Sequence, residues 1–189
     1  NLSTSLYFIV NDQFYSKSLP KAKLNDGVIV DSLNHVATER PELVAKYYGR
    51  LANTEADAIT ALNTMLAQDG LFIYVPKNVQ LERTIQVINI LRSDVDLMVN
   101  RRVLIVLEEG AKAQFLFCDH AADDRNFLAT QVIEAYVGAN ANLELNCLEE
   151  THAKNVRVSN VYIEQQRDSR ASHNVITLHN GVTRNMLDL

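Results

Sequence analysis

The hydrophobic pattern of the chain changes character near residue 70. Before it, short apolar runs such as Leu6–Val10 and Val28–Val30 predict brief strands, with a turn at 11–13 between them. After it, β-branched and aromatic runs recur with Gly, Asn, Asp and Lys in the gaps, and none has a helical period. These runs are Phe72–Val75, Ile85–Ile90, Val103–Leu107, Phe115–Phe117, Val132–Val137, Leu143–Leu148, Val156–Ile163 and Val175–Leu178. Strands without intervening helices exclude a doubly wound α/β fold.

Helical periodicity is confined to residues 38–69. The helical segment itself is expected at about residues 40–69. Pro41 suits a first helical turn, and an apolar stripe follows at Leu43, Val44, Tyr47 and Leu51. A second helix is predicted to start at a Thr54 cap, with Asp57 in its first turn. Its expected buried face comprises Ala58, Ile59, Leu62, Met65 and Leu66. Gly70 is expected to end it in the left-handed conformation.

Three similar segments in the strand-rich part indicate a repeating architecture. Aligned residue for residue, they are 77–81, 111–115 and 139–143, which superposes Lys77 on Ala111 and Ala139. Each has a turn, a small residue, an amide-bearing side chain and then an apolar residue that opens a strand. Repeats of about 20–50 residues are typical of stacked folds, so we expect a parallel β-helix whose amide side chains stack in ladders at the corners. The expected division is an N-terminal strand and helix segment, 1–70, and a β-helix, 71–189.

Composition narrows the range of partners. The formal net charge is −5, which argues against binding to nucleic acid or to an anionic membrane surface. No apolar run approaches the roughly 20 residues of a membrane-spanning helix, and no secretion signal is apparent, so a cytoplasmic location is expected. The two cysteines cannot form a disulfide framework and are expected to be reduced. Because the chain starts at Asn1 and stops within an alternating stretch, we expect it to be a segment of a longer polypeptide.

Candidate chemistry is sparse. Cys118 and His120 share one side of a strand and could contribute to a metal site, but four convergent ligands are normally needed. Cys147 is expected on the opposite face from Cys118, as a buried apolar filler. His173 falls in a polar stretch that is expected to form surface contacts. No phosphate-binding loop, nucleophile elbow or metalloprotease motif occurs, so neither catalytic residues nor a bound cofactor is predicted.

Four segments resemble one family in the correct order. Residues 70–87, beginning Gly-Leu-Phe-Ile-Tyr-Val-Pro-Lys, are similar to a signature of the SufB/SufD family of iron–sulfur cluster assembly scaffold proteins, with Thr84 in place of the usual Pro. The helix segment 61–66, the turn segment 102–111 and the Asn-Gly-Val-Thr-Arg-Asn segment 180–185 resemble further family motifs, the last with Val182 in place of a Gly. A compact linker and the lack of a cysteine-bearing cluster motif favour SufD over SufB.

The resemblance implies a right-handed parallel β-helix and a non-catalytic scaffold. It also implies pairing with a homologous SufB-like subunit and docking of a SufC-like ABC ATPase, which binds ATP while the complex handles an iron–sulfur cluster. Self-association of this chain is a further expectation, because strand edges at the end of a stack can pair. Two alternatives remain open. A β-helix polysaccharide lyase or hydrolase could use Asp119 and Glu144, and a cupin-like metal binder would need grouped histidines.

Overall fold

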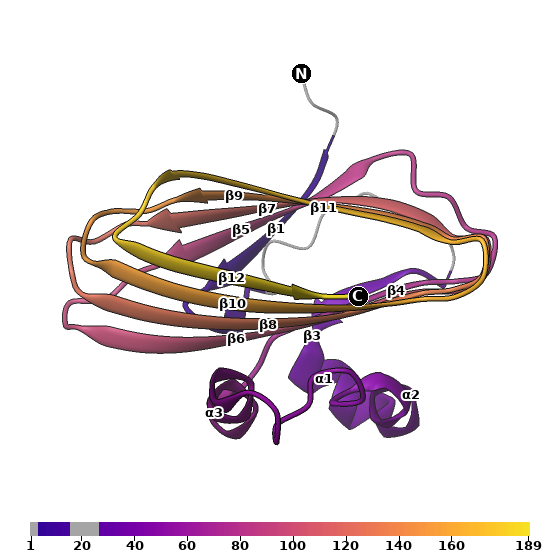
Figure 1. The fold of residues 1–189 in the computed structure, drawn as a ribbon, viewed down its shortest axis with the longest axis horizontal. Helices are drawn as coiled ribbons and strands as arrows, with labels where there is room; N and C mark the ends of the chain where they lie inside the picture. The colour runs from indigo at the N-terminus through magenta and orange to yellow at the C-terminus, as the bar shows by residue number, and fades with distance from the viewer. Residues whose placement is uncertain (1–3, 16–26) are drawn as a thin grey trace.

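A computed structural model describes residues 4–15 and 27–189 of the chain. Two sheets face each other and form a parallel β-helix of about four turns, with three short helices on one outer side (Figure 1). The fold is therefore mainly β with a short helical segment near the N-terminus, as the sequence predicts. None of the helices in the described ranges is both long and apolar enough to cross a bilayer.

Each coil of the β-helix contributes one strand to each sheet. Sheet A has the order β11-β9-β7-β5-β1-β2, and sheet B has the order β12-β10-β8-β6-β4-β3. The strands of sheet A are β1 (Thr4–Val10), β2 (Gln13–Phe14), β5 (Thr84–Leu91), β7 (Lys112–Ala121), β9 (Asn142–Glu150) and β11 (Arg170–His179). Those of sheet B are β3 (Ile29–Ser32), β4 (Leu71–Val75), β6 (Leu97–Leu107), β8 (Phe127–Val137), β10 (Asn155–Gln165) and β12 (Val182–Asp188).

The early strands belong to the same sheets as the later ones. β1 pairs in parallel with β5 along its whole length, while β2 and β3 pair antiparallel with β1 and β4. Strands from before residue 70 therefore extend both sheets, and the domain division at that residue stays a prediction. The segment Asn25-Asp26-Gly27 before β3 also predicts a turn, and its first two residues lie outside the described residues.

The predicted alignment of the coils is wrong by two residues. β7 and β9 pair with Lys112 opposite Asn142, whereas the aligned segments would put Lys112 opposite Asn140. The true corner equivalents share a left-handed backbone, with positive φ at Asn78, Gly110, Asn140 and Asp168. Because Asn and Asp adopt this conformation more often than other non-glycine residues, they can replace glycine at a corner. Matching glycine to glycine therefore misaligned the coils. Amides do stack, but on strands: the Asn174 side-chain amide donates to Asn146 Oδ1 at 2.9 Å.

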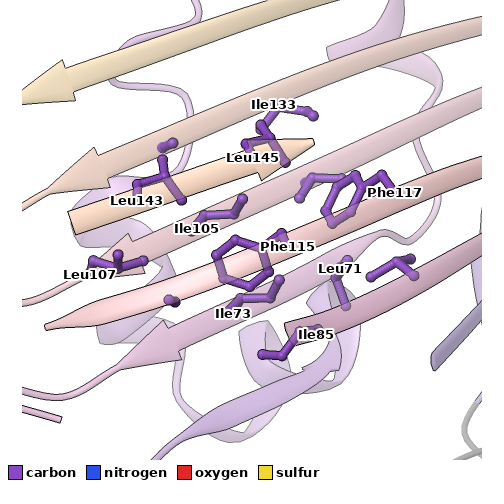
Figure 2. Close-up of a cluster of buried hydrophobic side chains, with 14 of the residues drawn as sticks. Leu71, Ile73, Ile85, Ile105, Leu107, Phe115, Phe117, Ile133, Leu143 and Leu145 are labelled. Carbon is purple, nitrogen blue, oxygen red and sulfur yellow. The ribbon is translucent and has the colours of Figure 1, made fainter. Parts of the chain in front are cut away.

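The space between the two sheets is filled mainly by apolar side chains in stacked rows. Leu71, Val103 and Ile133 form one such row on sheet B. On sheet A, Phe115 stacks against Leu145, as Figure 2 illustrates. Residues of this core are almost completely buried. Successive inward positions alternate with outward ones along each strand, which is the period expected of β structure.

The helices are α1 (Leu33–Glu39), α2 (Pro41–Tyr47) and α3 (Ala58–Leu66), and all three lie on the outer face of sheet B (Figure 1). The sequence did not predict α1. Pro41 does open α2, whose Val44 and Tyr47 pack on Leu104 and neighbouring residues of the sheet. The predicted caps of the second helix are wrong. Asp57, not Thr54, accepts from the backbone N–H of Thr60.

Gly70 has a different role from the one predicted. Helix α3 ends at Leu66, and its C-cap residue, Ala67, has an extended backbone. Gly70 is not among the residues with positive φ. A Cβ at Gly70 would instead collide with the backbone carbonyl of Arg102 on the neighbouring strand. Glycine is therefore required there by a close backbone approach rather than by a helix cap.

One buried ion pair attaches the helical segment to the sheet. Glu134 on β8 accepts an Arg102 guanidinium hydrogen bond at 2.7 Å, with both side chains almost fully buried. The same carboxylate accepts backbone N–H groups from Gly49, Leu51 and Ala52 at 2.9–3.0 Å. The loop after α2 is thus held by a carboxylate whose acceptor capacity is fully used.

Candidate functional site: a charged cluster inside the β-helix

The inward-facing rows change from apolar to charged toward the corner where the chain passes from sheet A to sheet B. On β6, Val103 and Ile105 point inward, and two residues before Val103 the same face carries Arg101. The inward faces of neighbouring strands carry Asp119 on β7 and, in register with it, Glu149 on β9. The inward face of β10 carries Arg157, in register with Ala129 of β8. All four side chains are 4% exposed or less. We call these four residues the lumen cluster.

The lumen cluster is a continuous chain of ion pairs. Asp119 is its centre: Arg101 Nη1 donates to one carboxylate oxygen at 3.0 Å and Arg157 Nε donates to the other at 2.6 Å. Arg157 Nη1 also lies 2.6 Å from a carboxylate oxygen of Glu149. Two guanidinium groups and two carboxylates make the formal charge zero, which is the condition under which buried charges are tolerated.

Neutral polar groups occupy several of the remaining positions around the cluster. The Asn89 side-chain amide donates to Asp119 at 2.7 Å, and the Thr177 hydroxyl donates to Glu149 at 2.7 Å. Arg157 donates to the side-chain carbonyl of Asn185 at 3.0 Å, and Arg101 Nε donates to the backbone carbonyl of Asn11 at 3.0 Å. These partners range from Asn11, directly after β1, to Asn185 in β12, so the cluster connects all the coils.

Electrostatics keep the cluster ionised. Burial alone would raise the pKa of Asp119, but the adjacent Arg157 and Arg101 hold that pKa below its usual range. Burial works against the charge on Arg157 as well, yet Asp119 and Glu149 raise the pKa of its guanidinium. Burial lowers the pKa of Arg101, which among the described residues has one carboxylate within ion-pair distance, that of Asp119. Asp119 is therefore the group on which the charges of both arginines depend.

A thiol and an imidazole lie beside the cluster. Cys147 Sγ is 3.8 Å from His173 Nε2, and both side chains point into the lumen. Burial raises the pKa of Cys147 to about 12, partly opposed by Arg157. Burial and Arg157 lower the pKa of His173. At neutral pH these are a thiol and a neutral imidazole, which is not an activated nucleophile. The expectation that His173 forms surface contacts is wrong, because its side chain points inward.

The candidate metal ligands predicted from the sequence lie outside the lumen cluster. Cys118 and His120 share the outer face of β7, and Cys118 accepts a weak bond from Gln86 at 3.8 Å. The described ranges contain no group of three or more His, Cys, Asp or Glu residues placed to hold a metal. The role of Cys118 and His120 stays a prediction. Cys147 lies opposite Phe117 and faces inward, so the two thiols are on opposite faces as predicted; a two-residue alignment error preserves the face.

The two carboxylates of the polysaccharide lyase or hydrolase hypothesis, Asp119 and Glu144, also do not lie together. Asp119 points into the lumen, whereas Glu144 lies on the outer face of β9, opposite Gln114 and not Leu116. Two carboxylates on opposite faces of a sheet cannot act on the same glycosidic bond. Sequence reasoning missed Arg101, Glu149 and Arg157. The available signal was charge at inward positions of otherwise apolar strands, such as the arginines that precede Val103–Leu107.

Comparisons with known proteins place these features in context. Residues 1–87 match the family model for the SufBD protein N-terminal region, and residues 89–189 match the SUF system FeS cluster assembly SufBD core domain. The chain is 32% identical over 143 residues to the chloroplastic iron-sulfur cluster assembly SufBD family protein ABCI8 of Arabidopsis thaliana, covering 74% of this chain and 24% of that protein.

Bacterial relatives give a similar result. The chain is 32% identical over 135 residues to the SufBD family protein slr0074 of Synechocystis sp., covering 70% of this chain and 28% of that protein. It is 33% identical over 100 residues to the iron-sulfur cluster assembly protein SufD of Bacillus subtilis, covering 52% of this chain and 23% of that protein. The chain thus spans about a quarter of the length of these relatives.

Proposed function

Because the chain belongs to the SufB/SufD family of iron–sulfur cluster assembly proteins, we propose that it is a scaffold segment of a SufBCD-type complex. In this role it pairs with a homologous β-helix subunit, and the whole protein also engages an ABC-type ATPase. The single observation that carries the proposal is the match of two consecutive family models over nearly the entire chain. The proposed location is the cytoplasm, although one relative is chloroplastic.

The internal structure supports a scaffold more than a catalyst. Coils joined by stacked apolar rows and by the lumen cluster form a stiff frame, which suits a protein that holds neighbours in fixed positions. The charges of the cluster are paired with one another and buried, so they are poorly placed to act on a substrate. We therefore assign no catalytic residue and no resident cofactor, and treat the iron–sulfur cluster as cargo of the complex.

The terminal strands support pairing with a homologous subunit. β11 and β12 are the last strands of the two sheets, so one edge of each has backbone groups without a neighbouring strand among the described residues. Ile176, Val182 and Leu187 are also largely exposed there. Edges of this kind associate readily with other strands.

Affinity purification of the full natural protein from cytosol tests the proposal. The tagged protein should recover, in near-stoichiometric amounts, a second SufB/SufD family subunit and an ABC ATPase, both identified by mass spectrometry. A matched purification from cells expressing the tag alone controls for background. Recovery of neither protein, under conditions in which the bait remains folded by circular dichroism, would contradict the proposed role.

A further inference from the structure

One histidine side chain joins two consecutive corners of the β-helix. The chain turns from sheet A to sheet B at residues 122–126, between β7 and β8, and again at residues 151–154, between β9 and β10. His152 belongs to the second corner and is half-buried. Its Nε2 lies 3.0 Å from the backbone carbonyl oxygen of Asp123 in the first corner. Its Nδ1 lies 3.1 Å from the backbone nitrogen of Lys154 in its own corner.

These two hydrogen bonds determine the protonation state of the ring. A carbonyl oxygen can only accept and a backbone N–H can only donate. Nε2 must therefore carry the proton that the Asp123 carbonyl accepts, and Nδ1 must be unprotonated to accept from Lys154. Only the neutral imidazole with its proton on Nε2 meets both conditions. A doubly protonated ring has no acceptor, so it would point one N–H group at another and lose the bond to Lys154.

The corner that His152 holds is itself bonded to the coils before and after it. The Lys154 carbonyl accepts from the backbone N–H of Phe127 in the preceding coil at 3.4 Å. The backbone N–H of Asn155 donates to the His152 carbonyl at 3.1 Å, and the Asn155 side-chain amide donates to Asn180 Oδ1, in the corner after β11, at 3.3 Å. A change at residues 152–154 is therefore felt by three successive corners.

Charged and titratable side chains lie in and beside these corners. They are Asp123, Asp124 and Arg125 in the first corner, Lys154 in the second, and Glu150 and His179 at the adjoining strand ends. Lys154 Nζ is 2.9 Å from the Asp124 carboxylate. Lys154, and to a lesser extent His152, lower the pKa of Asp124, so a charge on the ring is felt at that carboxylate. The two bonds to the ring come from backbone groups and not from these side chains.

We propose that His152 is an acid-sensitive latch between successive coils: the neutral ring holds the 151–154 corner against the preceding corner, and protonation of the ring releases it. Histidine is the side chain that ordinarily changes its charge between about pH 5 and pH 8, so mild acid operates the latch. Residues 153 and 154 are exposed, and the strands on either side of them are held by their own ladders. The corner can therefore open while β9 and β10 stay in their sheets.

The latch connects pH to the shape of an exposed surface. Lys154 borders an open hollow of about 390 Å³ on the outer side of sheet B, which Asn126 and Leu128 also line. The Lys154 N–H is one of the two groups that the neutral ring holds, so protonation frees a residue at the edge of this hollow. The lumen cluster takes no part, because its charges are paired inside the β-helix.

Hydrogen exchange of the full natural protein, read by mass spectrometry at single-amide resolution, tests the latch at about pH 8 and about pH 5.5. Rates are corrected for the pH dependence of intrinsic exchange. Protection of the Lys154 amide should fall by about twofold to tenfold in acid, which is the contribution of one hydrogen bond. The Asn142 amide is the internal reference, because it donates to the Ala111 carbonyl at 2.8 Å beside a corner without histidine. Its protection should not change.

Two variants separate the latch from a general effect of acid. His152→Gln cannot be protonated, so protection of the Lys154 amide should be the same at both pH values. His35→Gln is the matched control, because His35 is an exposed histidine on α1 that bonds Asp31, and it should keep the full acid response. Nitrogen-15 spectra of the histidine rings in the unmodified protein should place the proton of His152 on Nε2 at about pH 8. Equal protection at both pH values, an acid response that persists in His152→Gln, or a proton on Nδ1 at the higher pH would each overturn the proposal.

Discussion

Replacing Asp119 by Ala removes the central carboxylate of the lumen cluster. Arg101 then keeps only the backbone carbonyl of Asn11 as a close acceptor, while Arg157 keeps Glu149. Breaking a buried ion pair by deleting one partner costs about 3–5 kcal/mol, because the remaining charge is buried without compensation. We expect a loss within this range, since Asp119 serves two arginines that are each almost inaccessible to solvent.

Urea unfolding monitored by circular dichroism, with tyrosine fluorescence as a second probe, measures this loss. Asp124→Ala is the matched control, because the Lys154–Asp124 pair is exposed and exposed pairs contribute about 0–1 kcal/mol. If Asp119→Ala lowered the free energy of unfolding by no more than the control, the cluster would not stabilise the β-helix and the reasoning would be refuted.

The same residue predicts a dependence on pH. The folded pKa of Asp119 lies below its ordinary value of 3.8, so its ionisation stabilises the folded state above that value. This contribution is lost as pH falls below 3.8 toward the folded pKa. Asp119→Asn should therefore flatten the acid limb of the stability profile relative to the unmodified chain. An unchanged acid limb would show that Asp119 does not drive it.

Three further perturbations test separate parts of the fold. Glu134→Gln should lower the free energy of unfolding by about 3 kcal/mol and speed hydrogen exchange of the Gly49 and Ala52 amides, because a neutral amide cannot match the buried Arg102; unchanged exchange at these amides would contradict the proposed anchoring. Gly70→Ala should cost about 1–3 kcal/mol, measured as a lower thermal midpoint, since the added Cβ meets backbone; an unaltered midpoint would mean that the strands can separate without cost. In the folded chain, Cys147 should not react with a thiol reagent at pH 8, because its pKa is raised to about 12 and it is 5% exposed; rapid labelling before unfolding would indicate an open lumen.

The corners show why an alignment made from sequence was only partly right. Glycine at residue 110 and asparagine at 140 fill the same left-handed position, but residue identity alone pairs glycine with glycine. The strands themselves were predicted correctly because alternation of apolar residues is a local property. The register between coils is not local, since it depends on hydrogen bonds such as that from the Gly110 N–H to the Ala139 carbonyl at 2.8 Å.

Helix α3 shows a second limit. Periodicity identified the helix, but the buried face was assigned on the assumption that apolar residues face the core. The sheet beneath α3 offers buried polar groups, among them Thr130 and Asn160, which form hydrogen bonds with Asn63 and Thr60 respectively. The cost of leaving such groups unpaired exceeds the gain from burying a few apolar side chains, so the helix turned its polar face inward.

The sequence by itself determined the β-rich architecture, the order of the strands and the family, because these follow from local alternation and from motifs read in order. Only the tertiary structure decided which charges meet inside the β-helix. Arg101, Asp119, Glu149 and Arg157 come together through the stacking of coils, and no local pattern encodes how side chains on different coils pair. The physical reason is that buried charge is tolerated only where a distant segment supplies its counter-charge.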